Sequence, residues 1–211
     1  MTLNDRVVVL GVDLGGDGAA VLGDVDLRGR SVRVLGAFRW TRWAHEPRAT
    51  KQIILANKAK RTVPTEWSDL EAFYSRLRKN GARYRKELAR LLAIADPEYW
   101  ASEFNFTRES RGRRDLAHRI SLQVVKSQKA LWGWFLGEME WRVPEAEYVP
   151  VKPVGGTEAA LAWQATACTT EELRESGGGP SGEHVRDAAG VIRASVREIA
   201  RRLQAGSANY A

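Results

Sequence analysis

Hydrophobic and polar positions form three short strand-like runs at the start of the chain. Residues 6–13 (RVVVLGVD) are a β-branched apolar run that ends in an acid, and similar runs occupy 19–25 and 31–38. A Gly-containing turn signal at 27–30 joins the second run to the third. Runs of this kind separated by turn residues predict three consecutive antiparallel strands.

Further along the chain, helical and strand patterns alternate. Apolar residues recur at helical spacing over 66–95, where Asn80-Gly81 is a signal that would divide the segment into two helices. The other expected elements are strands at 99–106 and 148–154, helices at 118–141, 157–167 and 184–203, and an irregular segment at 43–64. Three strands followed by alternating helices and strands predict an α/β fold with a mixed five-stranded sheet, antiparallel first and parallel afterwards, flanked by helices. This is the element order of the ribonuclease-H-like fold.

Length and composition limit the class of protein. The chain has 211 residues, 44% of them hydrophobic, with one cysteine and three histidines. We expect a single domain over 1–211, with a basic insert or loop at about 40–66 and a flexible glycine-rich loop at 176–182. One cysteine excludes an internal disulfide, and no apolar run approaches the ~20 residues of a membrane span. We expect a soluble, cytoplasmic protein without a secretory signal.

Basic charge is concentrated in two segments. Residues 41–90 hold 13 Lys and Arg against 5 Asp and Glu, and residues 104–130 hold 7 against 2, although the net charge of the whole chain is only +7. Segregated positive charge is what a surface that binds a polyanion requires. Solvated basic helices would give the same composition, so charge alone leaves both interpretations open.

Four residues could carry chemistry. Asp13 ends an apolar strand, Glu103 lies in an aromatic one, and His184 and Asp187 share one side of the last predicted helix because they are three residues apart. Each of these residues alone is at least as well explained as a structural or surface residue. Together they would offer three carboxylates and one imidazole, a donor set that suits Mg²⁺ or Mn²⁺ better than a soft metal.

Several segments of the sequence resemble the RuvC family of Holliday junction resolvases, within the ribonuclease-H-like nuclease superfamily. The matching segments, in family order, are VVVLGVDLG (7–15), DPEYWASEFNF (96–106), SQKALWGWFLGEM (127–139), EYVPVKPVGGTEAALAW (147–163) and HVRDAAGVIRAS (184–195). The chain departs from the family in the turn after Asp13, which reads LGGDG, and in a longer segment between Trp40 and Glu66.

The resemblance implies a homodimeric endodeoxyribonuclease that resolves four-way DNA junctions by paired nicking in recombination and repair, leaving 5′-phosphates. Asp13, Glu103, His184 and Asp187 would then be the catalytic residues and the ligands of two Mg²⁺ or Mn²⁺ ions. Asp13 would be shared by both ions, and His184 would bind metal or position the attacking water. A close-packed helix face with Gly133 and Gly137 would form the dimer.

The same resemblance assigns DNA contacts. Phe106 matches an aromatic residue that stacks on junction bases, although packing within its strand would equally explain it. The basic residues near it and beyond would contact the phosphate backbone: Arg108, Arg111, Arg113, Arg114, Lys126 and Lys152. The insert, with Trp40 and Trp43, is either an arm-binding element or a solvated loop.

Three other functions compete with the resolvase. A branched-DNA or flap endonuclease of wider range would use the same four residues. GVDLGGDG (11–18) also resembles the first phosphate loop of actin-like and sugar-kinase ATPases, but those folds need two such domains. A catalytically dead DNA-binding relative is disfavoured because all four ligand positions are filled.

Overall fold

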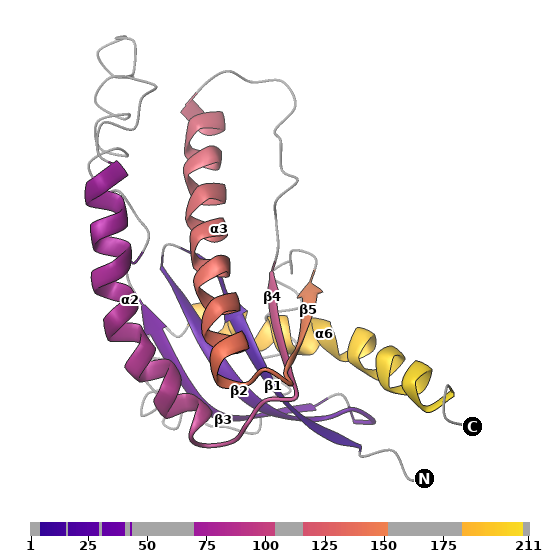
Figure 1. Cartoon of the computed structure of the whole chain (residues 1–211). Helices are drawn as coiled ribbons and strands as arrows, with labels where there is room; N and C mark the ends of the chain where they lie inside the picture. Colours follow the sequence, from indigo (N-terminus) through magenta and orange to yellow (C-terminus); the bar gives the residue numbers. More distant parts are fainter. Residues whose placement is uncertain are drawn as a thin grey trace.

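The described part of the chain comprises five strands and three long helices. The computed structural model describes residues 5–15, 17–29, 31–40, 43, 70–103, 116–151 and 183–208. Their elements are β1 (Arg6–Asp13), β2 (Gly18–Asp26), β3 (Ser31–Trp40), α2 (Leu70–Leu92), β4 (Tyr99–Glu103), α3 (Leu116–Arg142), β5 (Glu147–Val151) and α6 (Glu183–Ala208). The strands form one sheet, with α2 and α3 on one face and α6 across the other (Figure 1).

The sheet has the order β3-β2-β1-β4-β5. β1 pairs with β2 and β2 with β3 in antiparallel fashion, whereas β4 pairs in parallel with both β1 and β5. The turn between β2 and β3 is closed by the Asp26 side chain, which accepts hydrogen bonds from the backbone N–H groups of Arg28 and Gly29. The predicted mixed five-stranded sheet, and with it the ribonuclease-H-like strand order, is confirmed.

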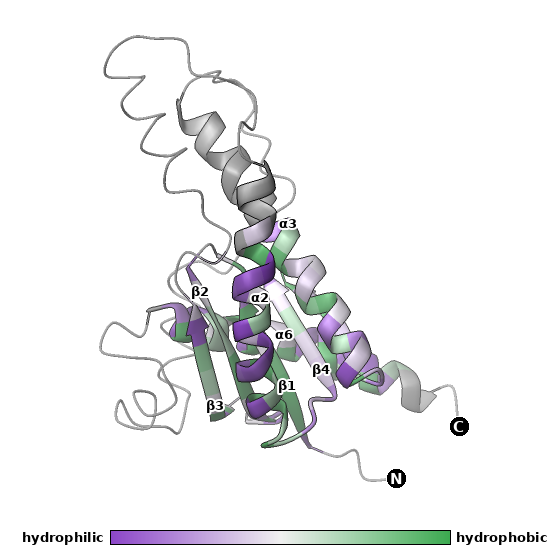
Figure 2. Cartoon of the chain, turned by 60° about the vertical axis from the view of Figure 1, so that its left-hand side comes forward, coloured by the Kyte–Doolittle hydropathy of each residue, from purple (hydrophilic) through white to green (hydrophobic). Residues whose placement is uncertain are grey.

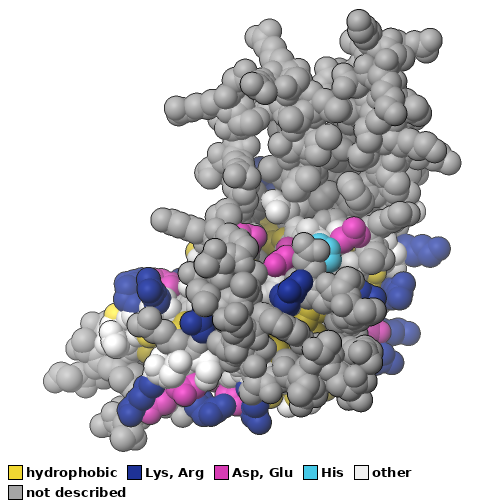
Figure 3. Space-filling model, turned by 180° about the vertical axis from the view of Figure 1, so that it is seen from behind, with side chains coloured by type: hydrophobic (Ala, Val, Ile, Leu, Met, Phe, Trp, Pro, Cys, Tyr) yellow, Lys and Arg dark blue, Asp and Glu magenta, His cyan; other side chains and the backbone are white. Residues whose placement is uncertain are grey.

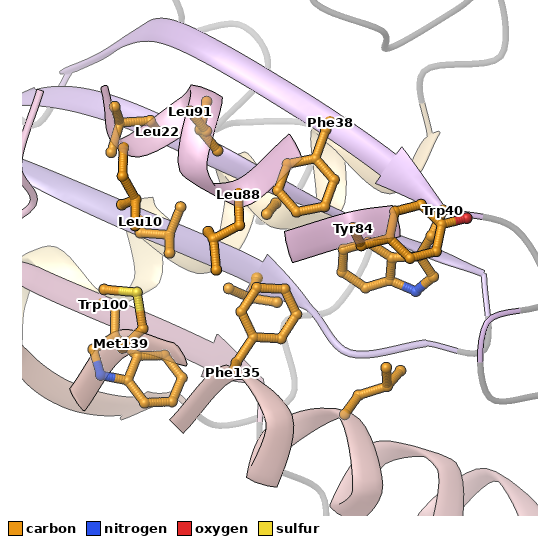
Figure 4. Packing of buried hydrophobic residues seen from close by; sticks show 14 of the residues in the cluster. Leu10, Leu22, Phe38, Trp40, Tyr84, Leu88, Leu91, Trp100, Phe135 and Met139 are labelled. Atoms are coloured by element: carbon orange, nitrogen blue, oxygen red, sulfur yellow. The ribbon is translucent and has the colours of Figure 1, made fainter. Parts of the chain in front are cut away.

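The face covered by α2 and α3 is packed with large aromatic side chains. Phe38, Trp40, Tyr84 and Phe135 lie together in one buried cluster, and the rings of Phe38 and Tyr84 stack at 6.3 Å (Figure 4). Figure 2 shows β1 and β3 as hydrophobic along most of their length, while α2 also carries hydrophilic residues. This pattern is what an amphipathic helix covering a buried sheet requires.

α2 runs unbroken through the position where the sequence signalled a break. Gly81 lies inside the helix, and a Cβ atom placed there would come within 3.0 Å of the indole nitrogen of Trp134 on α3. The glycine therefore serves close packing between α2 and α3 and does not end a helix. The expected division at Asn80-Gly81 is wrong because tertiary packing outweighs the modest cost of a glycine in a helix.

Trp40 and Trp43 belong to the core. Both side chains are buried, with rings 5.3 Å apart at nearly a right angle, and the Trp40 indole N–H donates to the Gly15 carbonyl. The alternative in which these two residues help to bind a DNA arm is therefore wrong. The remainder of the insert, at 41–42 and 44–66, lies outside the described residues, as does the glycine-rich loop at 176–182.

The opposite face of the sheet is lined by small aliphatic residues and covered by α6. The stripe expected on this helix is confirmed, with five buried members and Leu203 partly buried: Val185, Ala188, Ile192, Val196, Ile199 and Leu203. Among the described helices, none is both long enough and apolar enough to cross a bilayer.

Candidate metal centre

Asp13 and Glu103 end neighbouring parallel strands at the same edge of the sheet. Val12 of β1 is in register with Ser102 of β4, so the residues that follow them, Asp13 and Glu103, come next to each other. Side chains alternate along a strand, and Val9 and Ala101 both pack in the α6-side cluster. Asp13 and Glu103 share their parity, so both belong to the α6 face.

The close approach of α6 to β1 depends on Gly11. A Cβ atom at this position would overlap with the Ala188 carbonyl oxygen and with the Ile192 side chain. Because β1 carries no side chain there, the first turns of α6 can lie directly on the strand, two residues before Asp13. This packing brings His184 and Asp187 to the end of β1.

Three of the four predicted ligands converge in the structure. One donor atom from each of Asp13, His184 and Asp187 can be chosen so that all lie within 4.8 Å of one another, and all three residues are half-buried. Figure 3 shows acidic side chains gathered on both sides of a histidine on this face. Glu103 lies beside Asp13 in the sheet register but is not part of this tight group.

His184 and Asp13 are joined directly. The His184 Nδ1 atom lies 2.8 Å from the Asp13 Oδ2 atom, and the side chains are 42% and 18% exposed. The hydrogen bond to Asp13 raises the pKa of His184 above its usual 6.5, with smaller contributions from the charges of Asp17 and Asp187 and an opposing effect of burial. The protonated form of the imidazole is thus favoured beside the carboxylates, because its positive charge offsets their mutual repulsion.

Asp17 is an acid near the site that the sequence analysis did not identify. It lies on the turn between β1 and β2, and its negative charge contributes to the raised pKa of His184. The Trp40 indole bond to Gly15 holds this turn, and Gly18 lets the chain pass close to the end of β1, because a Cβ atom there would overlap with the Asp13 carbonyl oxygen. The motif DLGGDG (13–18) could have indicated this residue, because a tight glycine turn can bring Asp17 back beside Asp13.

The donor set fits a hard divalent cation. Carboxylate oxygens and one imidazole from separate elements meet at a partly exposed sheet edge, with a further carboxylate charge from Asp17 close by. Oxygen-rich sites of this kind favour Mg²⁺ or Mn²⁺, and a bound cation would relieve the repulsion among the acids. His184 must lose its proton before its ring nitrogen can act as a ligand.

The predicted DNA contacts are almost entirely outside the described residues. Phe106, Lys152 and the four arginines between them belong to segments that the structure does not describe: Arg108, Arg111, Arg113 and Arg114. Lys126 lies on α3, but its side chain is not described. These assignments remain predictions.

No protein-family model and no curated protein matches the sequence. Two Holliday junction resolvases are among the solved structures to which the chain is similar. The Thermus thermophilus RuvC bound to a Holliday junction has a TM-score of 0.44 at 18% identity, covering 93% of this chain and 96% of that one. The fowlpox virus Holliday junction resolvase has a TM-score of 0.43 at 9% identity, covering 90% of this chain and 99% of the other.

Proposed function

We propose that this chain is a metal-dependent, structure-selective DNA endonuclease that resolves Holliday junctions by paired nicking in recombination and repair. The observation that carries the proposal is the convergence of Asp13, His184 and Asp187 at the end of β1, beside Glu103. The order and spacing of the sequence segments that resemble RuvC resolvases support it independently.

The proposed roles follow from where each side chain lies. Asp13, at the centre of the group, would be the ligand shared by two cations, with Glu103 and Asp187 on either side. His184, hydrogen-bonded to Asp13, would complete the donor set or hold the attacking water. When bound, a pair of divalent cations lowers the pKa of water and stabilises the departing 3′ oxygen of a phosphodiester. The product would carry a 5′-phosphate.

The nearby basic and aromatic residues would hold the DNA. β4 ends at Glu103, and Phe106 follows three residues later, so a stacking residue there would lie within a short chain distance of the carboxylates. Stacking of a base on an aromatic ring contributes about 1–3 kcal/mol. The arginines of 108–114, with Lys126 and Lys152, would bind the phosphates of the arms without reading their sequence.

Paired nicking needs two sites, and we propose that a second copy of the chain provides the other. Gly133 and Gly137 lie one turn apart on α3, both are exposed, and a Cβ atom at either would meet no atom of the described residues within 4 Å. This leaves room for another helix on that side of α3. Sedimentation at micromolar concentration would show a dimer, and a strictly monomeric species would contradict paired nicking.

A cleavage assay on branched DNA tests the function. The full chain is incubated with labelled four-way junction, flap, fork and linear duplex, with Mg²⁺, with Mn²⁺ and with EDTA. We expect symmetric, ligatable nicks in the junction, dependent on the cation and far slower in duplex. Equal cleavage of flaps and forks would favour the broader branched-DNA nuclease. No cleavage of any substrate, with purified and folded protein, would contradict the nuclease assignment.

A further inference from the structure

A row of cross-strand neighbours connects the candidate metal centre with an arginine on the edge strand. Asp13 of β1 pairs with Ala19 of β2, and Ala19 pairs with Arg39 of β3. Neighbouring strands are about 4.8 Å apart, so the backbones of Asp13 and Arg39 are separated by roughly 10 Å. Both residues stand near the same end of the sheet.

Arg39 belongs to the same face of the sheet as Asp13. Residues directly opposite each other in neighbouring strands project to the same side. Ala19 is a buried member of the α6-side cluster, and Ala37, two residues before Arg39, packs against that cluster as well. Phe38 and Trp40, which flank Arg39 in sequence, are buried on the opposite face. The alternation therefore assigns Arg39 to the α6 face.

Arg39 also differs from the other described arginine of β3. Arg33 donates to Asp24 at 2.8 Å, so its guanidinium is held by a carboxylate within the fold, which it shares with Arg6. Arg39 is exposed, and the structure shows no ion pair between it and any described carboxylate. Lys and Arg side chains lie near the acidic group and its histidine on this face (Figure 3).

We propose that Arg39 binds a backbone phosphate of the nucleic acid strand whose neighbouring phosphate is held at the Asp13 site. This inference rests on the proposed function. A phosphate chain that approaches a cluster of carboxylates is repelled by them unless cations flank the path, and a guanidinium group presents paired donors that fit phosphate oxygens. The ~10 Å between the two backbone positions is short enough for a long arginine side chain to reach a phosphate next to the one held at Asp13.

The test compares Arg39→Ala with Arg33→Ala in the full chain. Binding of a fluorescent four-way junction is followed by anisotropy in Ca²⁺ over a series of salt concentrations, and Mn²⁺ affinity is measured by calorimetry. We expect Arg39→Ala to weaken junction binding about tenfold and to reduce the slope of log K against log salt by about 1. Arg39→Lys should keep most of the slope, and Mn²⁺ affinity should be unchanged in every variant.

The outcomes separate this inference from the proposed function. If the wild-type chain binds the junction and Arg39→Ala binds it as tightly as the wild type, then Arg39 is only a charged residue that protects an edge strand, and the inference is overturned. If the wild-type chain binds no branched, single-stranded or duplex DNA, the proposed function falls and this inference with it. Equal loss of binding in both arginine variants would point to general charge and would also overturn it.

Discussion

The two faces of the sheet are packed with different kinds of residue, and only the face under α6 carries the predicted ligands. The face under α2 and α3 is filled with Trp, Tyr, Phe and Leu, whereas the face under α6 is lined mainly with Val, Ala and Ile, and Gly11 lies beneath the helix. Aromatic side chains bury large areas, and small residues let a helix backbone approach a strand closely. Large buried side chains thus stabilise the face under α2 and α3, and small residues let α6 lie close to the other face. The predicted ligands Asp13, His184 and Asp187 meet on the face under α6.

This division predicts that ligand substitutions and core substitutions have separable consequences. Substitution of a predicted ligand should lower cation affinity and cleavage without changing the packing of the aromatic face. Changing a core residue lowers the free energy of unfolding without altering cation affinity in the chain that remains folded. Residues at the α6–β1 contact should affect both.

Asp13→Asn should have the largest effect on activity. Loss of the ligand that we propose both cations share would remove several kcal/mol of transition-state stabilisation, so junction cleavage should fall by about 10³-fold or more. Junction binding should be kept or improved, because one negative charge is removed from the phosphate site. Single-turnover cleavage and anisotropy measure the two effects. Asp96→Asn, at an exposed position before β4, is the control and should cleave like the wild type.

Phe135→Ala should have the largest effect on stability. Its fully buried ring contacts Trp40 at 5.7 Å and lies between α3 and the sheet, so its removal should cost about 3–5 kcal/mol in urea unfolding. Cation affinity of the folded fraction should stay within twofold of the wild type. Ile94→Ala, at a 54% exposed position, should change stability by less than about 0.5 kcal/mol. Loss of cation binding in folded Phe135→Ala would contradict the independence of the two faces.

Gly11→Ala should have an intermediate effect on both properties. The added methyl group would overlap with the backbone of Ala188, which cannot move without shifting α6, so we expect a loss of about 1–3 kcal/mol and weaker Mn²⁺ binding. Gly36→Ala is the matched change on the other face, where the nearest atoms are the flexible side-chain ends of Leu91 and Ile94. A smaller cost for Gly11→Ala than for Gly36→Ala would reverse the proposed contrast.

The pH dependence of cation binding should show the smallest effect. The pKa of His184 is raised above 6.5, chiefly by its hydrogen bond to Asp13, so cation and proton compete for this residue up to a higher pH than usual. Mn²⁺ affinity should fall by up to about tenfold per pH unit below that raised pKa and level off above it. His184→Gln should flatten this dependence. An unchanged slope in His184→Gln would show that another group titrates.

The raised pKa of His184 also predicts how the free energy of unfolding of the cation-free chain depends on pH. A group with a raised pKa in the folded state contributes stability that is complete below its unfolded pKa of about 6.5. That contribution is lost as the pH rises through the folded value. Urea unfolding in EDTA should therefore show the wild type losing stability relative to His184→Gln as the pH rises above 6.5.

Local patterns predicted the regular parts of the fold. The β-branched apolar run of β1, the turn signal at 27–30 and the apolar stripe of α6 each depend on neighbours in sequence, and the structure has a strand, a turn and a buried stripe at these places. The i, i+3 spacing of His184 and Asp187 was sufficient to place both on one side of their helix. Their meeting with Asp13 was implied only by the family resemblance, because the spacing itself says nothing about a strand end far away in the sequence.

Long-range packing explains what the sequence could not supply. Trp40 and Trp43 stand in a basic, aromatic segment that is typical of a binding surface. Only their ring contacts with Tyr84 and Phe135, which are distant in sequence, show that both belong to the core. The low helix propensity of glycine predicted a break at Gly81, whereas in the structure Gly81 lies inside α2 and lets Trp134 of α3 pack close to it. Asp17 was missed because its relation to His184 depends on how one tight turn is held by an indole 25 residues away.

Anomalous diffraction from crystals of the full chain soaked in Mn²⁺ is the most direct measurement of where the cation binds. We expect peaks within ligand distance of Asp13, with Asp187 and Glu103 as further ligands and His184 beside them. The chain also has an acidic hollow at the opposite end of β4, lined by Asp96, Glu98, Glu145 and Glu147. Manganese bound there while the end of β1 stays empty, in crystals of protein that cleaves junctions, would contradict the assignment of the metal centre.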